Sequence, residues 1–337
     1  MNSFGRIFRV HIFGESHGAG VGIVIDGCPA GLPLTLADFL PDLERRKAGA
    51  KGTTPRKEDD LPAFRSGLFN DRATGAPITI LFENNNTRSG DYEKQRAVPR
   101  PGHADFVANH KYGGFEDYRG GGHFSARLTV GIVAAGVIAK RILESYSPDI
   151  RIRADIEEIG GEVNPEIGLQ KAIDAKDTIG GIVECRVKGL PVGLGEPFFD
   201  SAESLLAHAV FAIPAVRGIE FGTGFAAARM FGSQHNDSIV HADGRTATNH
   251  AGGIVGGITN GNELVFRIAI KPTSSTPKEQ TTLNWETGQV EPFSVKGRHD
   301  LCVALRAPVI LEAMTAIVLA DLLMLEGKVP RIFTATT

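Results

Sequence analysis

Two long segments of this 337-residue chain contain few polar side chains, and they constrain its fold more than any other feature of the sequence. Residues 128–143 and 308–325 are rich in alanine, valine, isoleucine and leucine, a pattern that predicts two apolar helices. A helix that is apolar on nearly all sides must be buried. The second segment also carries Glu312 and Asp321, which favours a core helix over a membrane span.

Shorter segments with strand patterns are distributed around these two helices in the sequence. Residues 7–13 alternate apolar side chains with Arg9 and His11, and residues 21–26 form a second apolar run. The glycine-rich segment 14–20 between them predicts a hairpin connection at a sheet end. Strands grouped around two buried helices predict an α+β fold. The other strands that the patterns predict lie at 180–187, 254–259 and 263–270.

The chain is longer than one hydrophobic core usually requires. Each apolar helix follows a polar loop, the first at 120–127 and the second at 298–306. We therefore predict a single domain over residues 1–337 that contains two pseudo-repeat halves, at about 1–150 and 151–337.

Charge and cysteine content exclude several classes of function. The formal net charge is −3, so the chain has no global positive field for nucleic acid or anionic lipid. Its three cysteines form no C-x-x-C pair, which predicts reduced thiols, no disulfide and no metal site. The N-terminus lacks the apolar run of a secretory signal. We expect a cytoplasmic protein with no nucleic-acid or membrane partner.

Three dense polar islands suggest where chemistry occurs. They are GESHG at 14–18, RPGHAD at 100–105 and RHD at 298–300. Glycine lets backbone approach a ligand closely, histidine moves protons near neutral pH, and arginine binds phosphate or carboxylate through two bonds. His17 and His103 each lie on a glycine-flanked loop, a setting suited to general acid catalysis. Together the islands predict one composite site for an anionic substrate.

Two further loops lie between the first two islands. Residues 36–46 predict a helix with Thr35 as its N-cap, and the charged, weakly periodic segment 45–60 predicts a loop. That loop is either a solvated basic segment or a lid that closes over an anion. A second polar loop at 83–95 precedes Arg100.

Two familiar motifs are matched only in part. GESHG fits the G-x-S-x-G nucleophile elbow, but an elbow needs a strand before it and a helix after it, whereas the pattern predicts a strand after it here. A serine hydrolase using Ser16 is therefore a minor alternative. The glycines at 252–257 do not open a helix with an acidic residue about 20 positions on, so dinucleotide binding of the Rossmann type is not expected.

A series of short motifs, taken in order, resembles the chorismate synthase family from about residue 4 to about residue 325. The motifs are FGESHG at 13–18, a helix at 38–46 ending in two arginines, RPGHAD at 100–105, KYG at 111–113, YRGGG at 118–122, SAR at 125–127, NHAGGIVGGI at 249–258, KPTSS at 271–275 and RHD at 298–300.

The resemblance implies a β-α-β sandwich with helices between antiparallel sheets, assembled as a homotetramer. It implies that the substrate is 5-enolpyruvylshikimate 3-phosphate and that a 1,4-trans elimination of phosphate gives chorismate, the last common step of the shikimate pathway. Reduced FMN is required without net redox. A non-catalytic flavin- or phosphate-binding protein is the other alternative.

The resemblance also assigns roles to particular residues. Catalysis is implied for Ser16, His17, His103, Ser125 and Asp300. Substrate binding is implied for Arg46, Arg100, Arg127 and Arg298. FMN binding is implied for His123, Phe124, Ser125, Pro214, Ala215, Gly256, Lys271, Pro272, Thr273, Ser274, Ser275 and Arg298. NADP contact is implied for Arg46 and Lys51.

The chain departs from the family pattern near two of these positions. His123, Phe124 and Leu128 replace the usual arginine, serine and glutamate, so a permanent cation becomes a titratable one. Lys47-Ala48-Gly49 replaces the usual Arg-Pro-Gly in a loop that is shortened. These changes affect the predicted flavin site and the predicted NADP contact.

Overall fold

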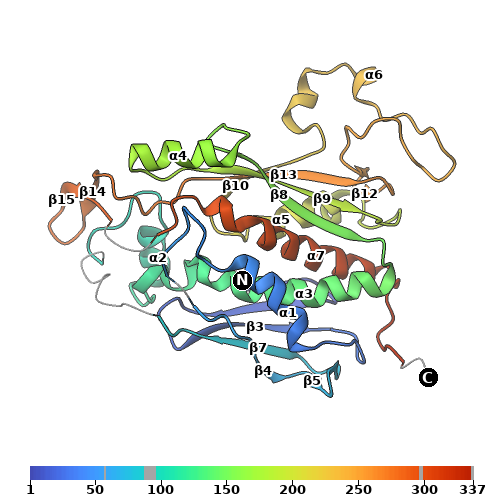
Figure 1. Cartoon of the computed structure of the whole chain (residues 1–337), viewed down its shortest axis with the longest axis horizontal. Coiled ribbons are helices and arrows are strands. Elements are labelled where there is room, and N and C mark those ends of the chain that lie inside the picture. Colours follow the sequence, from blue (N-terminus) through green and yellow to red (C-terminus); the bar gives the residue numbers. More distant parts are fainter. Residues whose placement is uncertain (57, 87–95, 296–298, 335–337) are drawn as a thin grey trace.

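The structure, a computed structural model, describes residues 1–56, 58–86, 96–295 and 299–334. Two antiparallel sheets lie on either side of a layer of helices (Figure 1). The first has the order β1-β2-β3-β7-β4 and consists of Ser3–Phe4, Arg9–Gly14, Gly20–Asp26, Ile78–Glu83 and Ala63–Ser66. The second has the order β10-β13-β9-β8 and consists of Val216–Phe221, Leu264–Ile270, Gly181–Lys188 and Arg151–Ile159. The predicted α+β sandwich is confirmed.

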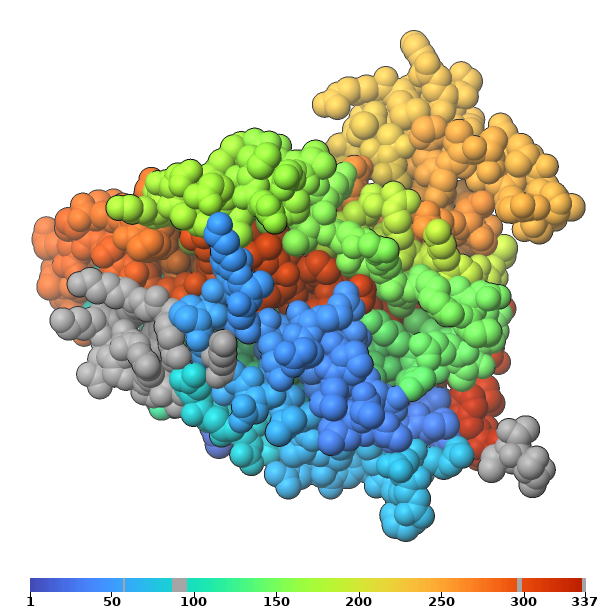
Figure 2. Space-filling model, viewed as in Figure 1, coloured from blue at the N-terminus to red at the C-terminus, as the bar shows by residue number. Residues whose placement is uncertain are grey.

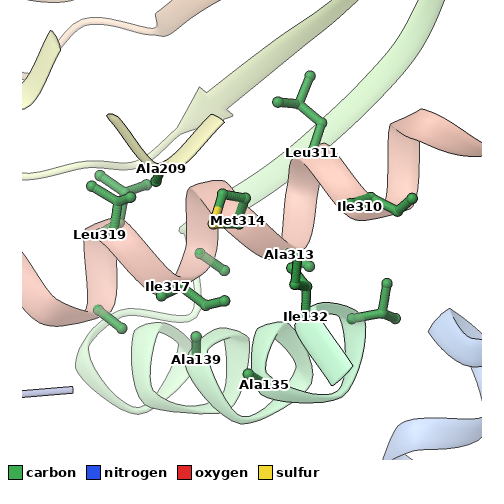
Figure 3. Close-up of a cluster of buried hydrophobic side chains, with 14 of the residues drawn as sticks. Ile132, Ala135, Ala139, Ala209, Ile310, Leu311, Ala313, Met314, Ile317 and Leu319 are labelled. Atoms are coloured by element: carbon green, nitrogen blue, oxygen red, sulfur yellow. The ribbon is translucent and has the colours of Figure 1, made fainter. Parts of the chain in front are cut away.

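The middle layer is built on the two apolar helices that the sequence predicted. They are α3, Thr129–Tyr146, and α7, Ala307–Leu325, and they run in the same direction side by side (Figure 1). They approach closely at Gly136, where a Cβ atom would lie 2.3 Å from the Cβ of Ala313. Small side chains such as Ala135 and Ala139 face α7 in the same layer (Figure 3). The core therefore depends on short side chains as well as on apolar ones.

Helix α7 also explains why the chain carries one segment with the composition of a membrane span. Among the described residues, only Val303–Leu325 is long and apolar enough to cross a membrane. However, 89% of its most apolar window is buried inside the protein. It is the core helix that Glu312 and Asp321 indicated.

The first strand of the predicted hairpin begins later than the sequence pattern suggested. The strand expected at 7–13 is β2, Arg9–Gly14, because the backbone N–H groups of Arg6, Ile7 and Phe8 donate to the carboxylate of Asp321 at 2.8 to 2.9 Å. Those N–H groups therefore have a partner in α7 instead of a neighbouring strand. β2 and β3 then pair from Arg9↔Asp26 to Gly14↔Val21, which confirms the hairpin.

Helix α1, Leu36–Arg46, carries Arg46 to the edge of the helical layer. Its first turn is closed by Asp38, whose carboxylate accepts the Thr35 N–H at 2.7 Å. Near its other end, Arg45 donates two hydrogen bonds to the buried carboxylate of Glu312 in α7, and Lys140 of α3 contacts the same carboxylate at 3.0 Å. These ion pairs fix the C-terminal end of α1 against both central helices.

The prediction of one strand at 254–259 is wrong. The segment 254–259 is not a single strand but a hairpin of β11, Ile254–Val255, and β12, Ile258–Thr259. Gly256 and Gly257 both have positive φ, 63° and 87°, and turn the chain between them. Two more short hairpins are formed by β5, Leu68–Phe69, with β6, Arg72–Ala73, and by β14, Gln280–Asn284, with β15, Gln289–Phe293.

The remaining helices are shorter than α3 and α7. Helix α5 packs against α7, and α4 packs against β8. The segment that contains α6 stands away from the body of the molecule (Figure 2). The remaining helices are α2 Asp105–Tyr112, α4 Pro165–Ala175, α5 Ala202–Val210 and α6 Gly232–His235, with short 3-10 turns at Arg119–Phe124, Ala126–Leu128, Phe198–Asp200, Gly224–Arg229 and Val303–Arg306. The proposed division of the chain into pseudo-repeat halves stays a prediction.

Candidate active site

A cavity of about 620 Å³ lies where loops from both halves of the chain meet at the start of the two central helices. Residues 125–127 lead into α3 and also line the cavity, as do Val303 and Arg306 just before α7. The N-termini of both helices are therefore at this cavity, and their dipoles favour a bound anion. The cavity collects most of the predicted site residues: Ser16, His17, Arg46, Arg100, His103, Phe124, Ser125, Arg127, Pro214, Ala215, Lys271–Ser275 and Asp300.

Ser16 and His17 lie on the connection between β2 and β3, with side chains that are nearly buried. The Ser16 N–H donates to the Gly122 carbonyl at 3.0 Å. Gly120 has φ 60°, and a Cβ atom there would lie 2.2 Å from the His17 ring. Only glycine fits at 120, because a side chain would occupy the space of the histidine.

The second island forms a cluster of Arg100, His103 and Asp105, in which Arg100 is buried and the other two are half-buried. Arg100 binds both carboxylate oxygens of Asp105, each at 2.7 Å, and His103 Nδ1 lies 2.6 Å from the same carboxylate. Burial alone would raise the pKa of Asp105, but the hydrogen bonds from Arg100 and His103 outweigh it and hold that pKa well below its usual range. An ionised Asp105 assigns the proton on His103 to Nδ1, which leaves Nε2 as the other exchangeable nitrogen.

The third island lies only partly within the described residues, because Arg298 falls outside them. Asp300 lines the cavity and accepts the Thr54 N–H at 2.8 Å, with Arg306 at 3.3 Å. His299 also lines the cavity, and burial, followed by the charge of Arg100, lowers its pKa to about 4. This imidazole is therefore neutral at physiological pH, and its Nε2 has no hydrogen-bond partner among the described residues.

Arg46 and Arg127 form a pair of buried guanidiniums on one wall of the cavity. Their side chains are 2% and 5% exposed, and both form an ion pair with Asp60. Arg127 also donates to the side chain of Asn84 at 3.1 Å and to the carbonyl of Glu83 at 3.2 Å. Two fixed cations at the N-terminus of α3 suit an anionic group of a ligand.

The residues predicted to hold FMN line another wall. Lys271 Nζ donates to the Gly102 carbonyl at 2.8 Å and contacts Ser274 Oγ at 2.7 Å, which ties the KPTSS segment to the second island. Ala215 has φ 72°, a left-handed conformation that costs free energy in a residue with a side chain. Thr273 Oγ1 is buried with no partner among the described residues. A hydroxyl that has no partner can donate a hydrogen bond to a phosphate oxygen, and the positive charge of Lys271 on the same segment favours such a ligand.

A second cavity of about 640 Å³ adjoins the first. Its lining is more apolar and comes from the N-terminal strands, α3, α5 and α7. Five residues line both cavities, and all of them are predicted FMN residues: Phe124, Ser125, Pro214, Ala215 and Lys271. The two cavities offer adjacent polar and apolar space.

Three predicted residues are not brought to the first cavity. His123 faces the second cavity, with Nδ1 2.8 Å from the Gly14 carbonyl oxygen and Nε2 3.1 Å from Asn2 Oδ1. Gly256 lies in the β11–β12 turn and lines neither cavity. Lys51 is exposed and contacts Gln170 at 3.2 Å. The ligand contacts predicted for these three residues stay predictions.

Several cavity residues were not singled out from the sequence. Arg56 donates to Ser16 Oγ at 3.0 Å and pairs with Glu58, and Arg306 donates to the Arg46 carbonyl at 2.9 Å. With Asp60, these residues line the cavity. Three of them belong to the segment 45–60, which was interpreted by composition alone. The sequence signal for these three is the run of five consecutive charged residues, RKEDD, at 56–60.

The comparisons with known proteins agree with this geometry. The family model for chorismate synthase matches residues 8–324. A chorismate synthase of Chitinophaga pinensis is 72% identical over 333 residues, which is 99% of each chain. The chain belongs to the chorismate synthase family. A chorismate synthase of Dehalococcoides mccartyi is 45% identical over 98% of this chain and 99% of its own.

A solved structure of a chorismate synthase superposes with a TM-score of 0.73 at 26% identity, covering 96% of this chain and 93% of the other. Members of the chorismate synthase family are lyases that act on a small molecule. The serine hydrolase alternative loses its structural basis, because Ser16 lies between two antiparallel strands. A nucleophile elbow would require a helix after it.

Proposed function

We propose that the chain catalyses the 1,4-trans elimination of phosphate from 5-enolpyruvylshikimate 3-phosphate to give chorismate, with reduced FMN and no net redox. The observation that carries the proposal is the cavity itself, in which His17, His103 and Asp300 lie together with several arginines. A substrate with a phosphate and two carboxylates needs such a cluster of guanidiniums. The reaction is the last common step of the shikimate pathway.

Substrate binding is assigned to Arg46, Arg100 and Arg127, together with Arg298 outside the described residues. The cationic pair Arg46 and Arg127 stands on one wall and Arg100 on another. Three anionic groups on one rigid substrate can thus be held at once. The resulting orientation lowers the entropy cost of reaching the transition state.

Proton handling is assigned to the histidines and to Asp300. His103, oriented by the Asp105 carboxylate, donates a proton to the departing phosphate from Nε2 or neutralises its charge. His17 stabilises negative charge on the cofactor side of the site. Asp300 accepts and returns a proton at its carboxylate, with Ser16 and Ser125 as relays, while the Thr54 N–H holds it in place.

The residues present fit the flavin. When bound, reduced FMN supplies electron density to the substrate while phosphate leaves and a ring hydrogen is lost. Lys271, the unpaired Thr273 hydroxyl and Ser274 are suited to hold its phosphate, and Pro214 with Ala215 offers small side chains beside the adjoining apolar cavity. Gly256 and His123 remain part of this proposal.

We place the protein in the cytoplasm as a homotetramer. Exposed aromatic side chains support subunit contacts: Phe225 and Phe231 are on the surface, as are Phe198 and Phe199. Arg46 and Lys51 remain the proposed NADP contacts, although Arg46 is buried and Lys51 is exposed. We favour an external source of reduced flavin, because the sequence carries no dinucleotide-binding motif of the Rossmann type.

The proposal is tested by anaerobic turnover. Phosphate release and chorismate absorbance are followed from 5-enolpyruvylshikimate 3-phosphate with chemically reduced FMN, and again with oxidised FMN. We expect turnover only with the reduced flavin. Tight FMN binding without turnover would favour the non-catalytic flavin-binding alternative.

A further inference from the structure

Asp60 is the last residue of the charged loop and the group on which two predicted substrate arginines converge. It lies just before β4 in a left-handed backbone conformation with φ 51°. Its side chain is 2% exposed. One carboxylate oxygen contacts Arg127, and the other lies 3.5 Å from Arg46 Nη1.

The other partners of these two arginines are neutral. Arg46 Nη2 donates to the Arg127 carbonyl at 3.2 Å, and Arg127 donates to Asn84 and to the Glu83 carbonyl. Within the described ranges, neither guanidinium forms an ion pair with any carboxylate except Asp60. Among the described residues, Asp60 is therefore the one carboxylate in direct contact with both buried guanidiniums.

The electrostatic cost of this arrangement shows what Asp60 contributes. Burial lowers the pKa of Arg46 to about 9, and the charges of Arg306 and Arg127 act in the same direction. The charge of Asp60, and to a smaller extent that of Asp300, opposes these effects. A buried ion that loses its partner is strongly destabilised, because neither water nor a counter-charge replaces the lost interaction. Without Asp60 the two guanidiniums would repel each other and separate.

We propose that Asp60 is a positioning residue, which holds Arg46 and Arg127 at the spacing that binds the anionic substrate and limits the positive charge they present. This inference rests on the proposed function, because it assigns the two arginines to substrate binding. Asp60 thus has two effects of opposite sign. Its charge weakens the binding of a simple anion, whereas its geometry speeds turnover of the true substrate.

The test compares Asp60→Asn, which removes the charge, with Asp60→Glu, which keeps the charge and lengthens the side chain. Inorganic phosphate binding to the flavin-free chain is measured by calorimetry, and turnover is measured with reduced FMN. For Asp60→Asn we expect phosphate to bind roughly 3- to 10-fold more tightly and kcat to fall at least roughly 10-fold. For Asp60→Glu we expect phosphate affinity within about twofold of the unmodified chain and the same loss of kcat.

The matched control is Asp149→Asn, an exposed aspartate after the far end of α3, which should change neither quantity. Weaker or unchanged phosphate binding in Asp60→Asn, or an undiminished kcat in both variants, would overturn the inference. If Asp60→Asn does not fold, the kcat of Asp60→Glu decides whether Asp60 is a positioning residue. A kcat equal to that of the unmodified chain would exclude this role. If the unmodified chain shows no turnover, the proposed function fails, while the phosphate measurements still decide the charge effect of Asp60.

Discussion

The carboxylate of Asp105 orients the ring of His103. It is shared between Arg100 and His103, so one half-buried anion orients both a predicted substrate cation and a predicted acid. The hydrogen bond fixes the imidazole ring and its tautomer, as second partners of catalytic histidines commonly do. Sequence proximity within one island makes this possible, because all three residues lie on the turn that enters α2.

His103→Ala tests the role of this histidine as the acid. We expect kcat to fall by about 10²- to 10⁴-fold with little change in KM, because general acid catalysis acts in the transition state. Arg127→Ala is the comparison and should mainly raise KM. Steady-state kinetics under anaerobic conditions with reduced FMN measure both. A raised KM with unchanged kcat in His103→Ala would assign the histidine to binding instead.

At the scale of elements, the contact between α3 and α7 depends on Gly136. Glycine is a poor helix former, so replacing it with alanine favours the helix by about 1 kcal/mol. Here the added methyl group would lie 2.3 Å from the Cβ of Ala313, far inside contact distance. The two helices would have to move apart, and the cavity lies at their N-termini.

Gly136→Ala should therefore destabilise the protein despite the gain in helix propensity. Overpacking of this kind typically costs about 1–3 kcal/mol, and the gain in helix propensity offsets about 1 kcal/mol of it, so we expect a net loss of up to about 2 kcal/mol in the free energy of unfolding. Urea unfolding followed by circular dichroism measures it. Ser145→Ala, on an exposed position of the same helix, is the control. A more stable Gly136→Ala would show that the helices separate at no cost.

At the scale of the whole molecule, the site is assembled from loops that a rigid sandwich brings together. Ser16 and Asp300 are 284 positions apart in the sequence, yet both line one cavity with His103. The Arg45 and Glu312 ion pair fixes α1, and the bonds of Thr54 and Arg56 attach the charged loop to the other islands. The stability of the fold and the geometry of the site are therefore coupled.

This coupling predicts a pH dependence of folding. The pKa of His299 is about 4 in the folded chain and about 6.5 when unfolded, so the unfolded chain binds a proton that the folded chain does not. Stability from His299 is complete above the unfolded value and is lost as the pH falls from 6.5 toward 4. When the pH is lowered from 7 to 5, the free energy of unfolding measured in urea should fall by about 2 kcal/mol less in His299→Gln than in the unmodified chain. An equal fall in the free energy of unfolding in both proteins would mean that His299 is solvated in the folded chain.

Several parts of this architecture could be predicted from the sequence. The two apolar helices were found within three residues at each end, because burial on all sides requires an uninterrupted apolar composition. The hairpin around Ser16 could be predicted from the glycine-rich segment 14–20 and from the alternation of apolar and polar side chains in the strand before it. The start of β2 could not be predicted, because Asp321, more than 300 residues away in the sequence, takes the N–H groups that would have extended it.

The sequence by itself determined the composition of the core and the identity of the islands, because both are local properties of residues and of short motifs. Only the tertiary structure decided which charges meet. Asp60, Arg56 and Arg306 resemble ordinary solvated residues in the sequence, and they acquire a role because the fold brings them into contact with Arg46 and Ser16. Electrostatic partners depend on distance and burial, and those quantities exist only after folding.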